Sequence, residues 1–168
     1  RQTGGRAIIE STPGQGTTVS LWLPRHVGEN AATHTQVNVT VVRGRGQHVL
    51  LVEDEEMLRS IAREVLVEAG YRVSDCAEAY EALRLIDAGP PPDLLVTDIG
   101  LPGMDGRQLA LAARETLRNL PILFVTGYAW DAFADAPTLP EGTAMLSKPF
   151  SVHALIDAVT DLLGGTGP

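Results

Sequence analysis

A short apolar run leads directly into an acidic residue in DLLVTDIGLPGMDG, residues 93–106. Leu94, Leu95 and Val96 form a continuous apolar segment, which is typical of a parallel strand covered on both faces. The glycines and the proline that follow predict the end of the strand and a tight loop. Asp98 is therefore expected at the carboxyl end of a buried strand, where open α/β sheets bind their ligands. Taken alone, such an aspartate is more often a helix cap or a loop contact.

From residue 47 onward, strand and helix patterns alternate with short connections, which predicts an α/β fold with a doubly wound parallel sheet. The expected strands are residues 48–52, 71–75, 93–97, 121–125 and 143–146. Apolar residues at helical spacing lie between them and after the last one, and their faces, which include Ile61 and Val152, are predicted to be core. A fourth helix over residues 128–136 is expected to be short because prolines follow it.

Charge divides the chain into two parts. Residues 47–168 carry 8 Lys and Arg against 19 Asp and Glu, a net charge of −11, whereas residues 1–46 carry 5 against 2, a net charge of +3. The acidic part argues against direct nucleic-acid binding and favours a cation or a basic protein as partner. The single Cys76 excludes an internal disulfide, and the histidines lack zinc-site spacing. Without a signal peptide or a membrane-spanning apolar run, the sequence predicts a cytoplasmic location.

Polar residues stand at the expected carboxyl ends of the other strands, namely Glu53 and Asp54, Thr126, and Lys148. Because these ends share one edge of a parallel sheet, the side chains should converge on Asp98. Three neighbouring carboxylates repel one another unless a cation joins them. Their oxygen atoms suit Mg²⁺, and a divalent ion together with Lys148 would balance the charge. Each residue could also occur alone for a simpler reason, as a helix-start acid, a strand-end hydroxyl or a surface ion pair.

Four segments resemble, in order and at compatible spacing, the signatures of the receiver domain of two-component response regulators: HVLLVEDEEMLR, VTDIGLPGMDG, FVTGY and LSKPF. The resemblance implies a flavodoxin-like fold with five parallel strands in the order 2-1-3-4-5. It also implies that Asp98 accepts a phosphoryl group from phosphohistidine on a histidine kinase or a histidine phosphotransfer protein. Glu53, Asp54, Asp98 and the backbone carbonyl of Gly100 would then hold Mg²⁺.

The same resemblance implies roles for two further residues. Lys148 would neutralise charge on the phosphoryl oxygens, and Thr126 would hydrogen-bond one of them and so switch the neighbouring loop. A cis peptide before Pro149 would aim Lys148 into the site. Met145 stands where the family often has an aromatic residue, which puts aromatic switching in doubt.

Two positions beside the site bear on how long a phosphoryl group would remain. Gly100 stands two residues after Asp98, and Tyr128 stands two residues after Thr126. Neither side chain offers an amide or an acid that could orient an attacking water molecule. The sequence therefore predicts slow loss of phosphate.

The first 24 residues are expected to form a separate unit. The segment GGRAIIESTPGQGTTVSLWLP predicts two strands joined by a glycine turn, and it resembles the last hairpin of the ATP-binding domain of sensor histidine kinases. A lone hairpin is marginally stable in water. We therefore expect residues 1–24 to be the C-terminal remnant of a kinase domain, with a self-contained β-extension as the alternative. Residues 25–46 are expected to be a linker ending in a flexible hinge at residues 43–46.

These features are interpreted as the receiver domain, residues 47–168, of a hybrid histidine kinase in a phosphorelay. Such a domain passes its signal by conformational change or onward phosphotransfer, and it is an acceptor rather than a turnover enzyme. Two alternatives stay open, a Mg²⁺-dependent phosphohydrolase with Asp98 as nucleophile and a docking domain that needs no phosphorylation. The hydrolase would need a second acidic residue two positions after Asp98, where the sequence has Gly100. The docking domain would be favoured if residues of the acidic pocket were missing, and all of them are present. The oligomeric state is open, with Tyr128 and Phe133 as candidate surface residues.

Overall fold

The structure is a computed structural model, and it describes residues 6–14, 16–22, 44–127 and 140–164. The helix expected over residues 128–136, with Tyr128 and Phe133, lies outside the described residues, as does most of the expected linker. The chain divides into two units, residues 1–38 and residues 39–168, which are described separately.

The larger unit is built around a five-stranded sheet in the order β4-β3-β5-β6-β7, with every neighbouring pair parallel. The strands are β3 (His48–Val52), β4 (Arg72–Cys76), β5 (Leu94–Asp98), β6 (Ile122–Thr126) and β7 (Thr143–Ser147). This order confirms the flavodoxin-like fold. Three of these strands lie one residue later than expected, so Asp98 and Thr126 are the last residues of β5 and β6 rather than the residues that follow them.

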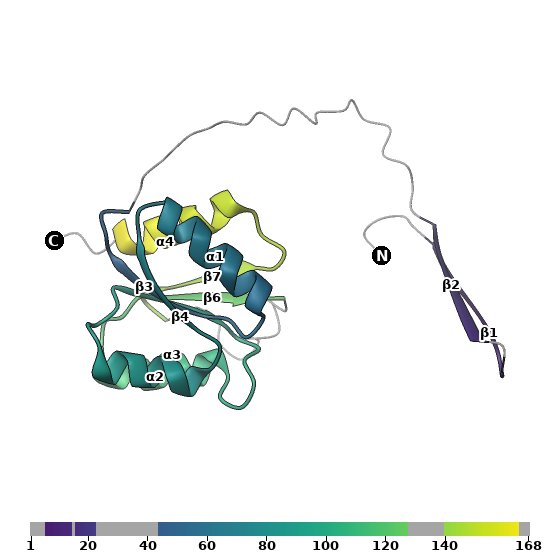
Figure 1. Cartoon of the computed structure of the whole chain (residues 1–168), viewed down its shortest axis with the longest axis horizontal. Coiled ribbons are helices and arrows are strands. Elements are labelled where there is room, and N and C mark those ends of the chain that lie inside the picture. Colours follow the sequence, from purple (N-terminus) through teal and green to yellow (C-terminus); the bar gives the residue numbers. More distant parts are fainter. Residues whose placement is uncertain (1–5, 15, 23–43, 128–139, 165–168) are drawn as a thin grey trace, which may run out of the picture. The chain divides into compact units, whose positions relative to one another are not determined.

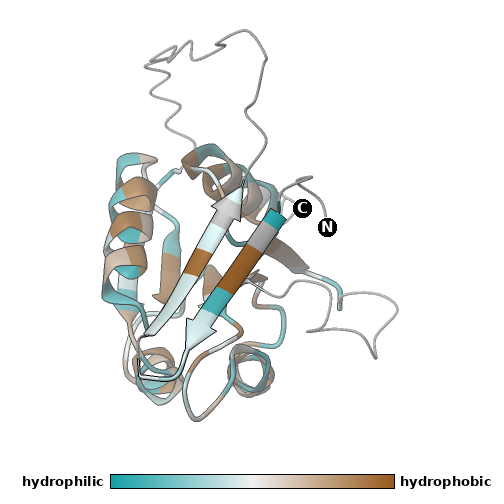
Figure 2. Ribbon diagram, turned by 90° about the vertical axis from the view of Figure 1, so that its right-hand side faces the viewer, coloured by the Kyte–Doolittle hydropathy of each residue, from teal (hydrophilic) through white to brown (hydrophobic). Residues whose placement is uncertain are grey.

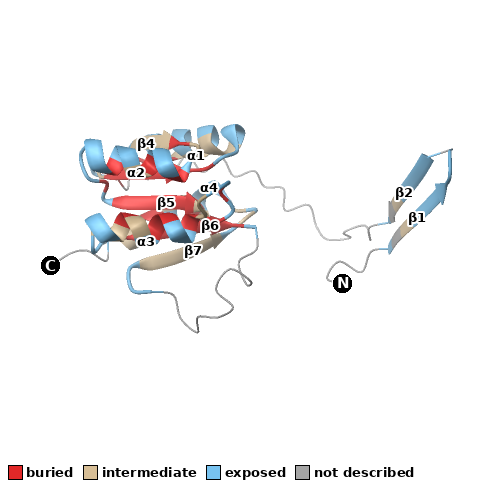
Figure 3. Cartoon of the chain, turned by 90° about the horizontal axis from the view of Figure 1, so that it is seen from below, coloured by how far each residue is buried: buried red, intermediate tan, exposed pale blue. Residues whose placement is uncertain are grey.

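Two helices cover each face of the sheet. Helices α1 (Glu56–Glu68) and α4 (Val152–Gly164) lie on one face, and α2 (Ala79–Ala88) and α3 (Gly106–Thr116) lie on the other (Figure 1). Alternate residues of the central strands enter opposite core clusters: Leu50 faces α2 and α3, whereas Leu51 faces α1 and α4. Figure 3 shows the central strands buried between the helices. Burial on both faces explains why β3 and β5 read as continuous apolar runs.

The loop after β5 is fixed close to Asp98 by two local features. The side chain of Asp105 caps α3 by accepting hydrogen bonds from the backbone N–H groups of Arg107 at 2.8 Å and Gln108 at 2.9 Å. A Cβ atom at Gly106 would overlap the carbonyl oxygen of Asp98 and lie 2.9 Å from its carbonyl carbon. The start of α3 can therefore pack against the end of β5 only because residue 106 has no side chain.

Two residues that the sequence places in the core are exposed. The exposed fraction is 50% for Ile61 on α1 and 48% for Val152 at the start of α4. The apolar stripe of α1 is wider than the surface that the sheet and α4 cover, so its outer edge faces solvent. The prediction of core positions was wrong for these two residues, and both instead line an apolar groove beside α1.

The expected hinge is anchored where the structure describes it. The backbone N–H of Gly44 donates to the carbonyl oxygen of Ala69 at 2.9 Å, and that of Gly46 donates to Gly70 at 3.0 Å. Gly44 is buried, and a Cβ atom there would lie 2.5 Å from the carbonyl carbon of Gly70. Residues 44–46 thus make backbone contacts within the larger unit, at the place where the sequence predicts a flexible hinge.

The smaller unit contains an antiparallel hairpin of β1 (Arg6–Thr12) and β2 (Gly16–Trp22), as expected. Ile9 pairs with Val19 across the two strands, and these side chains are 69% and 58% exposed. Figure 2 shows apolar positions in both strands. Within the parts of the chain that the structure describes, no helix is both long enough and apolar enough to cross a bilayer.

Candidate functional site

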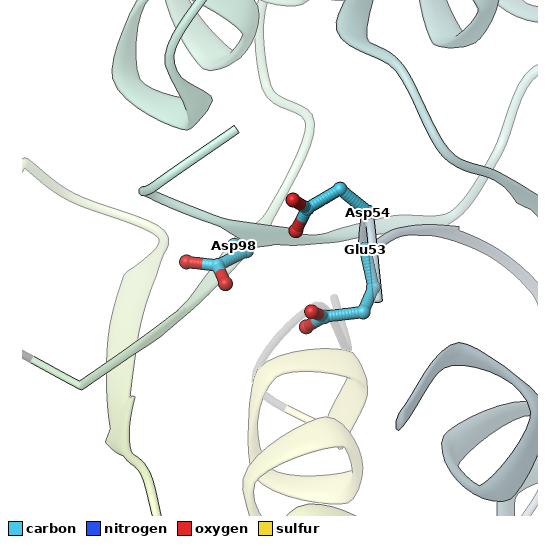
Figure 4. A group of neighbouring side chains, drawn as sticks. All are labelled: Glu53, Asp54 and Asp98. Atoms are coloured by element: carbon cyan, nitrogen blue, oxygen red, sulfur yellow. The ribbon is translucent and has the colours of Figure 1, made fainter. Parts of the chain in front are cut away.

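Three carboxylates meet at the carboxyl ends of two neighbouring strands. Glu53 and Asp54 directly follow β3, and Asp98 ends β5, which pairs with β3 in parallel. One ligand atom from each lies within 4.8 Å of the others. Figure 4 shows the carboxyl groups of Glu53 and Asp54 turned to the side on which Asp98 lies. Glu53 is buried, Asp98 is partly buried and Asp54 is exposed, so the cluster opens to solvent on one side.

Lys148 joins two of these carboxylates. Its ammonium nitrogen lies 2.7 Å from Oε2 of Glu53 and 2.6 Å from Oδ2 of Asp98. Its backbone N–H donates to the carbonyl oxygen of Thr126 at 2.8 Å, which ties Lys148 to the end of β6. The peptide bond between Lys148 and Pro149 is cis, as the family pattern suggested. The predicted convergence of Lys148 with Glu53 and Asp98 is therefore observed.

The protonation of the pocket follows from its burial and its charges. Burial raises the pKa of Glu53, because the hydrogen bond and positive charge of Lys148 offset only part of the desolvation, and the charge of Asp98 raises it further. Burial alone would lower the pKa of Lys148, but its hydrogen bonds to Asp98 and Glu53 outweigh this effect and raise the pKa. Lys148 is thus an ammonium ion at neutral pH, while Glu53 protonates more readily than an exposed glutamate.

The two carboxylate oxygens of Asp98 are held by different groups. Oδ1 accepts a hydrogen bond from the backbone N–H of Gly100 at 2.8 Å, and Oδ2 accepts one from Lys148. Thr126 is buried at the end of the adjacent strand, one residue beyond Val125, which pairs with Asp98. The structure therefore brings the predicted site residues to one edge of the sheet, with Thr126 at the end of the strand next to the one that carries Asp98.

One residue of this region was missed by the sequence analysis. Arg59, on α1, donates from Nη1 to the carbonyl oxygen of Glu53 at 2.7 Å. The sequence shows Arg59 as the last residue of the segment HVLLVEDEEMLR, which also contains Glu53 and Asp54. A long side chain on a helix can reach several partners, however, and the sequence does not say which of them it reaches.

An apolar groove begins beside the carboxylate pocket. It has a volume of about 390 Å³ and runs between α1 and the start of α4, with Lys148 in its wall. Its apolar lining comes from both elements and from the segment before α4: Leu58, Ile61, Ala62, Val65, Pro149, Phe150, Val152 and Leu155. The pocket and a surface suited to an apolar partner are therefore continuous through Lys148.

Comparisons with known proteins agree with this geometry. Residues 49–160 match the sequence profile of the response regulator receiver domain. The chain is 35% identical to the sensor kinase CckA of Brucella abortus over 97% of its own length, but it spans only 18% of that protein. It is 37% identical to the response regulator receiver protein CpdR of the same species, covering 70% of this chain and 97% of that protein.

Solved structures agree as well. A response regulator receiver protein from Sinorhizobium medicae matches 71% of this chain and 96% of its own with a TM-score of 0.65 and 33% identity. The receiver domain of the hybrid histidine kinase CckA matches 69% of this chain and 98% of its own, with a TM-score of 0.59 and 33% identity. The fold, the acidic pocket and these matches together show that the chain belongs to the response regulator receiver domain family of two-component systems.

Proposed function

We propose that Asp98 accepts a phosphoryl group in the pocket that it forms with Glu53, Asp54, Thr126 and Lys148. The observation that carries this proposal is the position of Lys148, whose ammonium group contacts Asp98 at 2.6 Å and Glu53 at 2.7 Å. A nucleophilic carboxylate beside a fixed cation has the charge arrangement that phosphoryl transfer requires.

The reaction is a displacement at phosphorus. One carboxylate oxygen of Asp98 forms a bond to the phosphorus atom while the P–N bond of the donor phosphohistidine breaks, and the departing imidazole nitrogen keeps the electron pair. The product is an acyl phosphate on Asp98. Lys148 neutralises part of the charge on the transferred group, and the Gly100 N–H orients the attacking carboxylate.

The donor set fits Mg²⁺. Three carboxylates with ligand atoms within 4.8 Å of one another, one of them open to solvent, provide the hard oxygen ligands that this ion takes together with water. Glu53, Asp54, Asp98 and the backbone carbonyl of Gly100 would hold it. When bound, Mg²⁺ supplies positive charge to the oxygens of the transferred group.

Thr126 is the proposed switch residue. Its hydroxyl stands at the buried end of β6, beside the strand that carries Asp98. A dianionic phosphoryl group on Asp98 would attract this hydroxyl as a hydrogen-bond donor and so displace the chain that follows β6. The change in charge at Asp98 would thereby alter the conformation of a neighbouring surface, which a partner protein could recognise.

A phosphodonor with a P–N bond tests the acceptor chemistry. The intact mass is measured after incubation with phosphoramidate, with and without Mg²⁺, for the unsubstituted chain and for Asp98→Asn. We expect one phosphoryl group, only with Mg²⁺ and only on the unsubstituted chain. An adduct on Asp98→Asn, or an adduct of equal yield without Mg²⁺, would contradict the proposal.

The donor protein is proposed to dock in the apolar groove beside the pocket. A phosphohistidine must reach Asp98, and the groove adjoins the pocket through Lys148, which contacts Asp98. An apolar face of a histidine kinase or of a histidine phosphotransfer protein would cover Ile61 and Val152. Because a kinase draws its phosphoryl group from ATP, the reaction is proposed to take place in the cytoplasm.

The hairpin is proposed to be the C-terminal remnant of a kinase ATP-binding domain, residues 1–24. It is joined to the receiver domain, residues 47–168, by a linker over residues 25–46, whose last residues, 44–46, are hydrogen-bonded to the larger unit. The alignment with sensor kinase CckA over 97% of the chain supports a hybrid kinase as the parent. The exposed Ile9 and Val19 support a missing apolar partner.

Hydrogen exchange tests this assignment. Amide protons of the hairpin are expected to exchange almost unprotected in the 168-residue chain and to become protected when the preceding kinase segment is attached. Strong protection in the 168-residue chain alone would favour a self-contained extension.

A further inference from the structure

The side chain of Arg59 connects the acidic pair of the pocket to the neighbouring strand β4. Its Nη1 donates to the carbonyl oxygen of Glu53 at 2.7 Å and makes a longer contact of 3.4 Å to that of Asp54. Its Nε lies 3.4 Å from Oδ2 of Asp75 on β4. The side chain of Arg59 is only 18% exposed, so these contacts are made largely out of solvent.

The backbone of Glu53 is held from both sides. Its N–H donates to the carbonyl oxygen of Cys76 at 3.2 Å, and its own carbonyl oxygen accepts from Arg59. Asp75, which precedes Cys76, fixes Arg59 and also lies 3.1 Å from Nε of Arg63 through its other oxygen. The carbonyl group of Glu53, where the chain leaves β3, is therefore bound by a guanidinium group that also lies beside Asp75.

We propose that Arg59, held by Asp75, is a positioning residue for the carboxylates of Glu53 and Asp54. This inference rests on the proposed function, because it concerns the residues that would hold Mg²⁺. Three crowded carboxylates repel one another, and a loop that is free to move would relax by spreading them apart. Arg59 prevents this movement by binding the carbonyl groups of both acidic residues, and its positive charge lies on the backbone side of the cluster, whereas Lys148 lies on the carboxylate side.

A purely structural role for Arg59 makes a different prediction. If the side chain only ties α1 to β4, its loss lowers the stability of the fold and leaves the affinity of the folded protein for Mg²⁺ unchanged. If it positions the carboxylates, its loss weakens Mg²⁺ binding in protein that is still folded. Groups behind metal ligands commonly change metal affinity by about 10–100-fold when they are removed.

The test compares three variants of the whole chain by calorimetric titration with Mg²⁺, with urea unfolding in EDTA measured separately. Arg59→Met keeps the length of the side chain and removes its donors, and we expect about tenfold weaker Mg²⁺ binding. Asp75→Asn should also weaken Mg²⁺ binding, but less than Arg59→Met does, because Arg59 keeps its contacts to the backbone carbonyl groups. Arg63→Met is the matched control: it removes the other partner of Asp75 from a side chain that is 53% exposed, and Mg²⁺ binding should not change.

Arg59→Lys covers the case in which Arg59→Met does not fold. A single ammonium group cannot reach both carbonyl groups and Asp75, so intermediate Mg²⁺ affinity is expected. Reduced stability with unchanged Mg²⁺ affinity in the folded Arg59 variants would overturn the proposal. Failure of the unsubstituted chain to bind Mg²⁺ would instead refute the proposed function, and the positioning role with it.

Discussion

The ammonium nitrogen of Lys148 lies 2.6 Å from Oδ2 of Asp98, although 50 residues separate the two along the chain. The contact is made because the parallel strands β5 and β7 end at the same edge of the sheet, where Asp98 is the last residue of β5 and Lys148 directly follows β7. It sets a fixed positive charge beside the proposed nucleophile.

Replacing Lys148 with Met should slow phosphorylation of Asp98 by roughly a hundredfold, because one fixed positive charge on the transferred group is lost. Mg²⁺ binding should persist, since the carboxylates remain and a competing cation is gone. The rate of phosphorylation by acetyl phosphate and the calorimetric Mg²⁺ affinity measure the two effects. Lys148→Arg, which keeps the charge, should be slowed less, and loss of Mg²⁺ binding in Lys148→Met would contradict this assignment.

Substituting Ile61 by Asp should weaken phosphotransfer from a phosphorylated donor protein and leave phosphorylation by acetyl phosphate unchanged. The charge would be placed in the apolar groove without touching the pocket. Val67→Asp is the control, because Val67 is on the same helix and 46% exposed but does not line the groove. Equal effects of the two substitutions would remove the groove from consideration as the donor surface.

The phosphorylated protein should lose phosphate slowly, and Gly100→Asn should speed the loss by supplying an amide that can orient water. Of the described atoms, a Cβ at Gly100 meets only Oδ1 of Asp98, at an ordinary contact distance of 3.6 Å, so the substitution has room. Decay is followed by intact mass after removal of the phosphodonor. A half-life of seconds for the unsubstituted protein would show that some other group activates water.

Gly106→Ala should destabilise the fold by about 1–3 kcal/mol or more, because the new methyl group would overlap the carbonyl oxygen of Asp98. Relief of this overlap would require the backbone of α3 or of β5 to move. Among the residues that the structure describes, none lies within 4 Å of a Cβ added at Gly127, so Gly127→Ala should change the free energy of unfolding by less than about 1 kcal/mol. Urea unfolding measures both variants. Equal stability of the two would mean that α3 can shift away from β5.

The thiol of Cys76 should contribute to a loss of stability at alkaline pH. Burial raises its pKa from 9.0 to about 11, with a smaller effect from the charge of Glu81. The folded protein holds this proton more tightly than the unfolded chain. The stability that the protonated thiol contributes is therefore complete below pH 9.0 and is lost as the pH rises through about 11.

Urea unfolding across this pH range checks the expectation. Cys76→Ala should show a shallower decline in the free energy of unfolding than the unsubstituted chain, whatever its absolute stability. Lys148, whose pKa is also raised, contributes in the same direction in both proteins and therefore cancels from the comparison. Parallel declines would show that the thiol ionises equally easily in both states.

The sheet could be predicted because strands that are buried on both faces have a simple sequence pattern. A short apolar run that ends at turn residues, such as Leu94, Leu95 and Val96, is typical of a buried strand, and parallel strands bring their carboxyl ends together whatever the details of packing. The prediction that Glu53, Asp98 and Lys148 lie close together followed from this rule.

Side-chain placement outside the strands was harder to predict. The helical period marks an apolar face but not how much of that face a neighbour covers, so Ile61 and Val152 were assigned to the core. Gly44 and Gly46 looked flexible because glycine permits many conformations, yet at Gly44 the absence of a side chain allows close packing against Gly70. The partners of Arg59 depend on the position of Asp75 in a different strand, which no local pattern contains.

Reductive peptide mapping tests most directly whether Asp98 is the phosphoryl acceptor. Borohydride converts the acyl phosphate of an aspartate into homoserine, so digestion and mass spectrometry after phosphorylation identify the acceptor. We predict homoserine at position 98, and at no other aspartate, in protein phosphorylated with Mg²⁺ present. Homoserine at position 54, or phosphorylated protein that yields no homoserine at position 98, would contradict the assignment of Asp98.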